Sequence, residues 1–178
     1  MTTNQFWRVQ SFSYILTYSF NRGAKLDALL HAANQQFAEV RKELLTAPIE
    51  WLPAMQENLR SLEQGRNLTL LPLTEELKTF QITASPVAKI AAETPEAACL
   101  AAILAASVSA QDHWMCAPVY RDALAFYDGQ DNLCGVLNIC FGCDKMITHQ
   151  QREVMAGIAT YQELKQFMTG LGHVISEK

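Results

Sequence analysis

Four side chains between residues 113 and 143 have the types and spacing of metal ligands. Two residues separate His113 from Cys116, and two residues separate Cys140 from Cys143. Imidazole nitrogen and thiolate sulfur are preferred zinc donors, and structural zinc sites hold four such ligands in a tetrahedron. Gly142 lies inside the second pair, where it permits a tight turn. The spacing therefore predicts a zinc site made of Cys116, Cys140, Cys143 and His113.

The same thiols also fit redox chemistry. Cysteines two residues apart are typical of thiol–disulfide proteins when a helix N-terminus or a cation lowers the pKa of one thiol, and Lys145 or Arg121 could be that cation. A disulfide from Cys143 to either Cys116 or Cys140 would then have a structural or sensing role. Buried cysteines that pack as small hydrophobic side chains are a third interpretation. Nucleophilic catalysis by a thiolate lacks a recognisable oxyanion hole or third catalytic group.

Two short runs of β-forming residues place the cysteines at one end of a hairpin. Residues 121–127 and 133–140 are the predicted strands, and the intervening Asp, Gly and Asn tolerate a turn backbone. Pairing that is symmetric about Gln130 brings Cys116 level with Cys143 at the open end. The predicted cross-strand pairs are Phe126 with Cys134, Leu124 with Val136, and Asp122 with Asn138. The first four of these residues then share one apolar face.

Other segments carry their own secondary-structure patterns. Alternating apolar residues predict a strand over residues 12–20, and Ser85-Pro86 indicates a break. Thr94-Pro95-Glu96 is typical of a helix start, with a hydroxyl N-cap followed by proline and an acid. Thr148 and Gln151 have the spacing of a capping box. The predicted amphipathic helices cover residues 24–45, 53–64, 95–109 and 149–171.

These elements predict an α+β fold in which a small antiparallel sheet packs against amphipathic helices. We expect one domain over residues 1–178, with residues 1–110 as a mostly helical scaffold. Residues 111–173 then supply the cysteine-containing hairpin and the C-terminal helix. The apolar stripe of the helix over residues 24–45 fits either the core of the domain or a homodimer interface.

Composition narrows the class of protein. The 178 residues are 49% apolar and 18% charged, which is ordinary for a protein that buries a core. A net charge of −4 argues against nucleic acid and anionic membranes as partners. No basic region followed by an apolar stretch stands at the amino end, so we expect a cytoplasmic protein without a signal peptide. Five cysteines without an export signal favour reduced thiols or metal ligands over a disulfide framework.

Residues 111–173 also resemble an uncharacterised bacterial family. Its members carry a cysteine and a proline before an Arg-x-Ala-aliphatic-x-Phe strand, then a glycine-bearing turn and a strand ending Ile-Cys-Phe-x-Cys. The matching positions here are Cys116, Pro118, residues 121–126, Gly135 and residues 139–143, with a similar closing helix over residues 161–167. The gap from Cys116 to Arg121 is longer than in the family, Asn138 stands where an acid is expected, and His113 is outside the resemblance. The resemblance implies that the three thiols matter, without an established activity.

The sequence therefore predicts a non-enzymatic binding or structural module. Its thiol cluster of Cys116, Cys140 and Cys143 is expected to hold a metal, with zinc as the candidate cofactor, or to lock the hairpin. The alternative is a thiol-dependent redox or sensor protein that uses the Cys140–Cys143 pair. No substrate or partner molecule follows from the residues.

Overall fold

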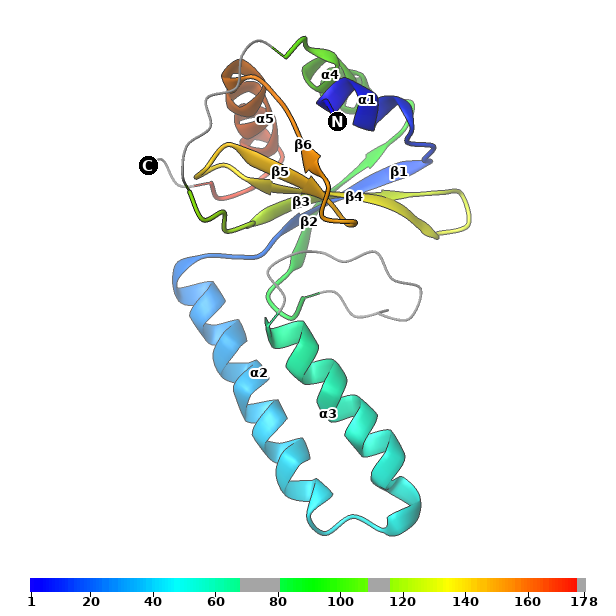
Figure 1. Ribbon diagram of the computed structural model, residues 1–178, viewed down its shortest axis with the longest axis vertical. Coiled ribbons are helices and arrows are strands. Elements are labelled where there is room, and N and C mark those ends of the chain that lie inside the picture. The colour runs from blue at the N-terminus through cyan, green and yellow to red at the C-terminus, as the bar shows by residue number, and fades with distance from the viewer. Residues whose placement is uncertain (68–80, 109–115, 176–178) are drawn as a thin grey trace.

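Six antiparallel strands form one sheet in the computed structural model, which describes residues 1–67, 81–108 and 116–175 (Figure 1). The strand order across the sheet is β2-β1-β3-β4-β5-β6. The strands are β1 Tyr14–Ser19, β2 Ser85–Ala91, β3 Asp122–Tyr127, β4 Leu133–Cys140, β5 Lys145–Thr148 and β6 Glu153–Val154. The predicted α+β class is confirmed. Strand β1, from the amino-terminal part of the chain, pairs directly with β3 of the hairpin, so both parts of the chain build the same sheet.

Three helices cover one face of the sheet: α1 Thr3–Arg8, α4 Pro95–Ala105 and α5 Ile158–Gly170 (Figure 1). The main hydrophobic core lies between these helices and the strands. Its fully buried members include Leu100 and Leu104 of α4, Leu164 of α5, and Leu124 of β3. Thr94 caps α4 as the sequence predicts, because its hydroxyl accepts a hydrogen bond from the Ala97 amide at 3.3 Å.

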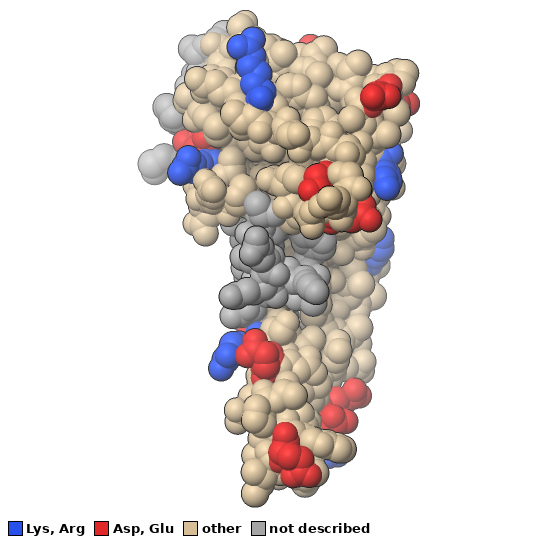
Figure 2. Space-filling model, turned by 90° about the vertical axis from the view of Figure 1, so that its right-hand side faces the viewer, with Lys and Arg blue, Asp and Glu red and all other residues tan. Residues whose placement is uncertain are grey.

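Two long helices, α2 Gly23–Leu44 and α3 Leu52–Asn67, extend away from the other side of the sheet as a helical arm (Figure 1). A short 3₁₀ helix, η1 Ile49–Trp51, precedes α3. In the side view the arm is narrow, its charged side chains are dispersed, and acidic groups stand at its far end (Figure 2). Helix α2 packs along α3, yet Ala33 is the one buried residue of α2. The homodimer suggested by the apolar stripe of this helix stays a prediction.

The hairpin forms, but its predicted register is wrong by one residue. Tyr127 pairs with Leu133, as symmetry about Gln130 requires, whereas Phe126 pairs with Gly135. A bulge at Cys134 takes up the extra residue, and such a bulge shifts all later pairs. The observed pairs beyond it are Leu124 with Leu137 and Asp122 with Ile139. Leu124 and Phe126 therefore share their face with Leu137 and Ile139, Val136 faces the opposite side, and Cys134 is exposed.

The predicted helix over residues 149–171 is wrong in its first part. Strands β5 and β6 occupy residues 145–148 and 153–154, and α5 begins at Ile158 after Gly157. The Thr148 hydroxyl does accept backbone hydrogen bonds, from Gln150 at 3.2 Å and Arg152 at 3.3 Å. These bonds close a β5–β6 turn rather than a helix, because Gln151 has a left-handed φ of 59°.

The remaining helix boundaries differ less from prediction. Helix α2 matches residues 24–45 within one residue, α3 continues past the expected stop at Gly65, and α4 ends at Ala105 rather than at residue 109. Strand β2 begins at Ser85-Pro86, where the sequence predicts a break. An edge strand tolerates proline, and the β1–β2 register shifts beside Pro86. Among the described residues, no helix has both the length and the apolar character that crossing a membrane requires.

Candidate functional site

A disulfide joins Cys116 to Cys143, whose Cα atoms are 5.9 Å apart. Cys116 is exposed in the segment that leads into β3, and Cys143 is half-buried in the turn between β4 and β5. The Cys143 sulfur also lies 3.6 Å from the carbonyl oxygen of Ala117. The predicted proximity of these two cysteines is confirmed, because the antiparallel pairing of β3 with β4 brings their flanking segments together.

Cys140 is close to this bond in the fold but is not part of it. It ends strand β4, pairs with Lys145 across the sheet, is 4% exposed and carries a free thiol. Its side chain packs in the second hydrophobic cluster, on the face opposite α4 and α5, together with Tyr120 and Cys143. Burial, followed by the nearby Cys140 and Glu153, raises the pKa of the Tyr120 hydroxyl.

A cavity of about 480 Å³ opens beside the disulfide. The segment before β3 contributes one wall, the β4–β5 turn a second, and α5 with the chain that follows it a third. The lining residues are Arg22, Ala117, Val119, Arg121, Cys140, Phe141, Gly142, Cys143, Asp144, Ile158, Tyr161, Gln162, Lys165 and Ile175. Since a typical small-molecule site has a volume of roughly 300 to 1,000 Å³, this space can hold a small ligand.

Tyr161 stands out among the residues that line the cavity. It is 3% exposed, and its buried hydroxyl has no hydrogen-bond partner within the described parts of the chain. Burial is the main cause that raises the pKa of this phenol, and the charge of Asp144 adds to it. The hydroxyl is therefore a neutral hydrogen-bond donor at physiological pH, and a buried donor without an acceptor is costly.

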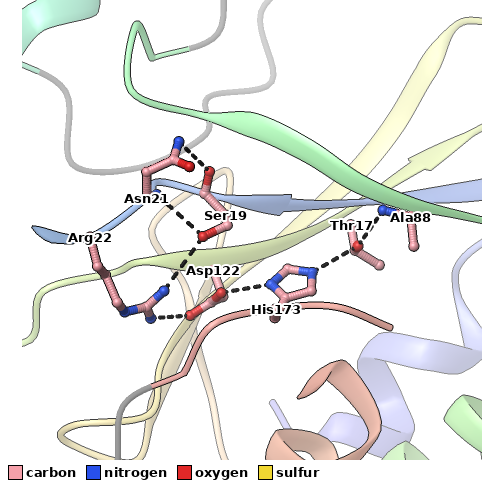
Figure 3. Close-up of polar contacts among 7 residues, drawn as sticks. All are labelled: Thr17, Ser19, Asn21, Arg22, Ala88, Asp122 and His173. Carbon is pink, nitrogen blue, oxygen red and sulfur yellow. Dashed lines mark hydrogen bonds and ion pairs between the residues drawn. The ribbon is translucent and has the colours of Figure 1, made fainter. Parts of the chain in front are cut away.

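A buried polar network adjoins the cavity through Arg22 (Figure 3). Asp122 is fully buried and accepts hydrogen bonds from Arg22 Nη2 at 2.5 Å and from His173 Nδ1 at 2.8 Å. His173 Nε2 lies 2.8 Å from the hydroxyl oxygen of Thr17. These bonds tie the chain after α5 to β1, β3 and the start of α2.

Neighbouring Asn21 extends the network to the segment before β2. Its side-chain amide donates to the Thr83 carbonyl oxygen at 2.5 Å and to the Ser85 hydroxyl at 3.0 Å. Asn21 has a left-handed φ of 57°, a conformation that asparagine tolerates better than most residues. The turn between β1 and α2 is thereby held against the strand at the edge of the sheet.

Thr17, His173 and Asp122 have the connectivity of a hydroxyl–imidazole–carboxylate relay. In a catalytic relay the hydroxyl must reach a substrate. Here Thr17 is 0% exposed and His173 is 2% exposed, and the Thr17 oxygen already accepts a hydrogen bond from the Ala88 amide at 3.2 Å. The network is therefore placed to hold β1, β3 and the chain after α5 together rather than to act on a substrate.

The four predicted zinc ligands do not form one metal site in the described part of the chain. Cys140 and Cys143 line the same cavity, Cys116 is bonded to Cys143, and His113 lies outside the described residues. Within residues 1–67, 81–108 and 116–175, no group of three His, Cys, Asp or Glu side chains is arranged to hold a metal ion. The Cys116–Cys143 bond engages two of the four predicted ligands with each other.

Comparisons with family models, curated proteins and solved structures find no match for this chain. The resemblance of residues 111–173 to an uncharacterised bacterial family stays a prediction.

The sequence alone does not point to several residues of this region. Asp122 did offer a sequence clue, because an acid inside a strand of apolar residues must find a partner when it is buried. The observed partners, Arg22 and His173, are 100 and 51 residues away in the sequence, so local spacing does not identify them. Tyr161 and Lys165 lie in a predicted helix, and the helical pattern alone does not show which side chains line a cavity.

Proposed function

We propose that this protein is a non-enzymatic binding module in which Cys116 and Cys143 form a redox-responsive clamp at the edge of a ligand cavity. The observation that carries the proposal is the position of this bond. It connects Cys116, in the segment that provides one wall of the cavity, to Cys143 in the turn that provides another. Breaking the bond frees the two walls to separate, so cavity shape would depend on thiol redox state.

The exposure of Cys116 supports a bond that forms and breaks in use. A small disulfide in solution can reach the Cys116 thiolate, which attacks one of its sulfurs and releases one small thiol. The Cys143 thiolate then attacks the Cys116 sulfur of this mixed disulfide, and the second small thiol leaves. The protein thereby loses two electrons and two protons, and the small disulfide gains them. In the cytoplasm, where we place the protein, thiols are otherwise kept reduced.

A thiol titration across a series of glutathione buffers tests the clamp. We expect five free thiols in the denatured reduced protein and three in the oxidised protein. The midpoint should fall within the range of the cytosolic glutathione pool, roughly −220 to −320 mV. Hydrogen exchange of residues 116–121 and 141–144 should accelerate on reduction. A bond that never forms, or one with a midpoint far below this range, would contradict a responsive clamp.

Matched cysteine variants separate the clamp from nonspecific oxidation. Cys116→Ser and Cys143→Ser should each abolish the transition, because either change removes one sulfur of the bond. Cys134→Ser is the control, since Cys134 is exposed but lies near the far end of β4. A transition that survives Cys116→Ser would assign the disulfide to another pair, such as Cys140 with Cys143.

The second candidate is a zinc-binding module that uses the reduced thiols. It is favoured by the shared position of Cys140 and Cys143 on one cavity wall, next to Cys116. Neutral imidazole from His113 would be the predicted fourth donor. Metal analysis of protein purified under reducing conditions without chelator decides between the two. Stoichiometric zinc that is lost in Cys116→Ser supports the metal site, whereas metal-free protein with a reversible thiol transition supports the clamp.

A further inference from the structure

We infer that the cavity beside the Cys116–Cys143 bond takes a small monocarboxylate with an apolar body. The carboxylate would face Arg121 and Lys165 and accept a hydrogen bond from the Tyr161 hydroxyl. This inference rests on the proposed function and names the ligand class of the same cavity.

The charge of the lining residues selects a monoanion. Three cations line the cavity, but Arg22 is already paired with Asp122 (Figure 3). No ion pair or hydrogen bond engages the side chains of Arg121, Lys165 or Asp144 within the described chain. Two available cations and one available carboxylate leave one positive charge to neutralise. A carboxylate matches that charge, whereas a doubly charged phosphate ester would exceed it.

The remaining walls favour an apolar ligand body. Val119, Phe141, Ile158 and Ile175 line the cavity, and Val119 and Ile158 are about half exposed, at 49% and 54%. Exposed apolar side chains gain free energy when a ligand removes them from water. A cavity of about 480 Å³ is large enough for an apolar chain or ring attached to the carboxylate.

The state of the Tyr161 hydroxyl is the observation that points to a bound ligand and not only to a charged surface hollow. The residue is almost completely buried, its hydroxyl oxygen included, yet that hydroxyl has no partner in the described structure. The groups that raise its pKa include Asp144 and Cys140, and both of these line the same cavity. A neutral phenol close to these residues can donate to an anionic oxygen, and hydrogen bonds to charged acceptors are the stronger ones.

Titration calorimetry with octanoate and its uncharged analogue octanamide tests the inference on the full-length oxidised protein. Octanoate should bind at one site with a dissociation constant about tenfold lower than that of octanamide. Inorganic phosphate should not compete with octanoate at millimolar concentration. Equal affinity for the acid and the amide would overturn the carboxylate assignment, and no binding of either would overturn the site.

Tyr161→Phe separates ligand binding from fold stability. Removal of an unpartnered hydroxyl should leave the melting temperature of the ligand-free protein unchanged or higher, while octanoate binding weakens about tenfold. Arg121→Gln and Lys165→Gln should each weaken octanoate and leave octanamide unchanged. Arg41→Gln, on the exposed surface of α2, is the control and should change neither. If Tyr161→Phe binds octanoate like the wild-type protein, or if Arg41→Gln weakens binding equally, the assignment is wrong.

The redox dependence of binding distinguishes failure of this inference from failure of the clamp. Octanoate that binds reduced and oxidised protein equally would retain the carboxylate site and reject the clamp as its regulator. A reversible thiol transition in a protein that binds no carboxylate would retain the clamp and reject this inference.

Discussion

The Asp122 carboxylate and the His173 imidazole form a buried pair, with 2.8 Å between Oδ1 and Nδ1. Because a carboxylate oxygen only accepts, Nδ1 carries the proton of this bond. The two residues are 51 positions apart and are 0% and 2% exposed. The pair therefore fixes the chain after α5 against the centre of the sheet, and through Arg22 it also fixes the first residue before α2.

Asp122→Ala should destabilise the protein by roughly 3 to 5 kcal/mol, the usual cost of removing one partner of a buried charged pair. The substitution leaves His173 without an acceptor and leaves Arg22 without its counterion. Urea unfolding followed by circular dichroism measures the loss. Glu43→Gln, an exposed position on α2, is the control and should change stability little. A loss below about 1 kcal/mol for Asp122→Ala would show that the network contributes little net stability.

The Cys116–Cys143 bond should stabilise the oxidised protein by roughly 3 to 4 kcal/mol, since it closes a loop with a sequence separation of 27 residues. The comparison is between oxidised wild-type protein and the double variant Cys116→Ser/Cys143→Ser in urea unfolding. Reduced wild-type protein should match the double variant. If reduction leaves the unfolding free energy unchanged, the loop is already held by other contacts.

Patterns that depend on local chemistry correctly predicted the positions of α2 and of the start of α4. The spacing of apolar residues located α2, and Thr94-Pro95 located the start of α4. The proximity of Cys116 to Cys143 also followed, because any hairpin with a turn near Gln130 brings them together, but the sequence left open whether Cys116 or Cys140 is the partner of Cys143. An error of one residue in register hardly changes the distance between the segments that carry Cys116 and Cys143. It does reverse the face of the sheet on which each side chain of β4 lies.

Features set by tertiary contacts could not be predicted in the same way. The bulge at Cys134 is one extra residue within a strand and leaves no marker in the residue types. Thr148 has the sequence of a helix cap, but the edge of the sheet offers pairing to residues 153–154, and the same hydroxyl closes a turn instead. His173 pairs with Asp122, which is 51 residues away in the sequence, so no local spacing predicts this contact.

Native alkylation with iodoacetamide checks the observed register. Cys134 should react as readily as exposed Cys99, whereas Cys140 should react after unfolding. In the register expected from the sequence, Cys134 would share the apolar face of Leu124 and be protected. Peptide mass spectrometry of partly labelled protein measures each site, and full labelling in denaturant is the control. A protected Cys134 would contradict the bulge and the pairing that follows it.

His149 should make the protein less stable in mild acid. Burial, followed by the charge of Arg152, lowers the pKa of His149 in the folded protein, and its Nδ1 is buried without a partner among the described residues. The unfolded chain then takes up a proton first as the pH falls below about 6.5. Stability that depends on neutral His149 is therefore complete above that pH and is lost as the pH decreases toward the lower, folded-state pKa. Urea unfolding between about pH 7.5 and 4.5, a range that spans the ordinary pKa of histidine, measures this decline. His149→Gln should make the decline less steep. His31→Gln, at an exposed position on α2, is the control and should leave it unchanged. An unchanged slope in His149→Gln would assign the acid sensitivity to other groups.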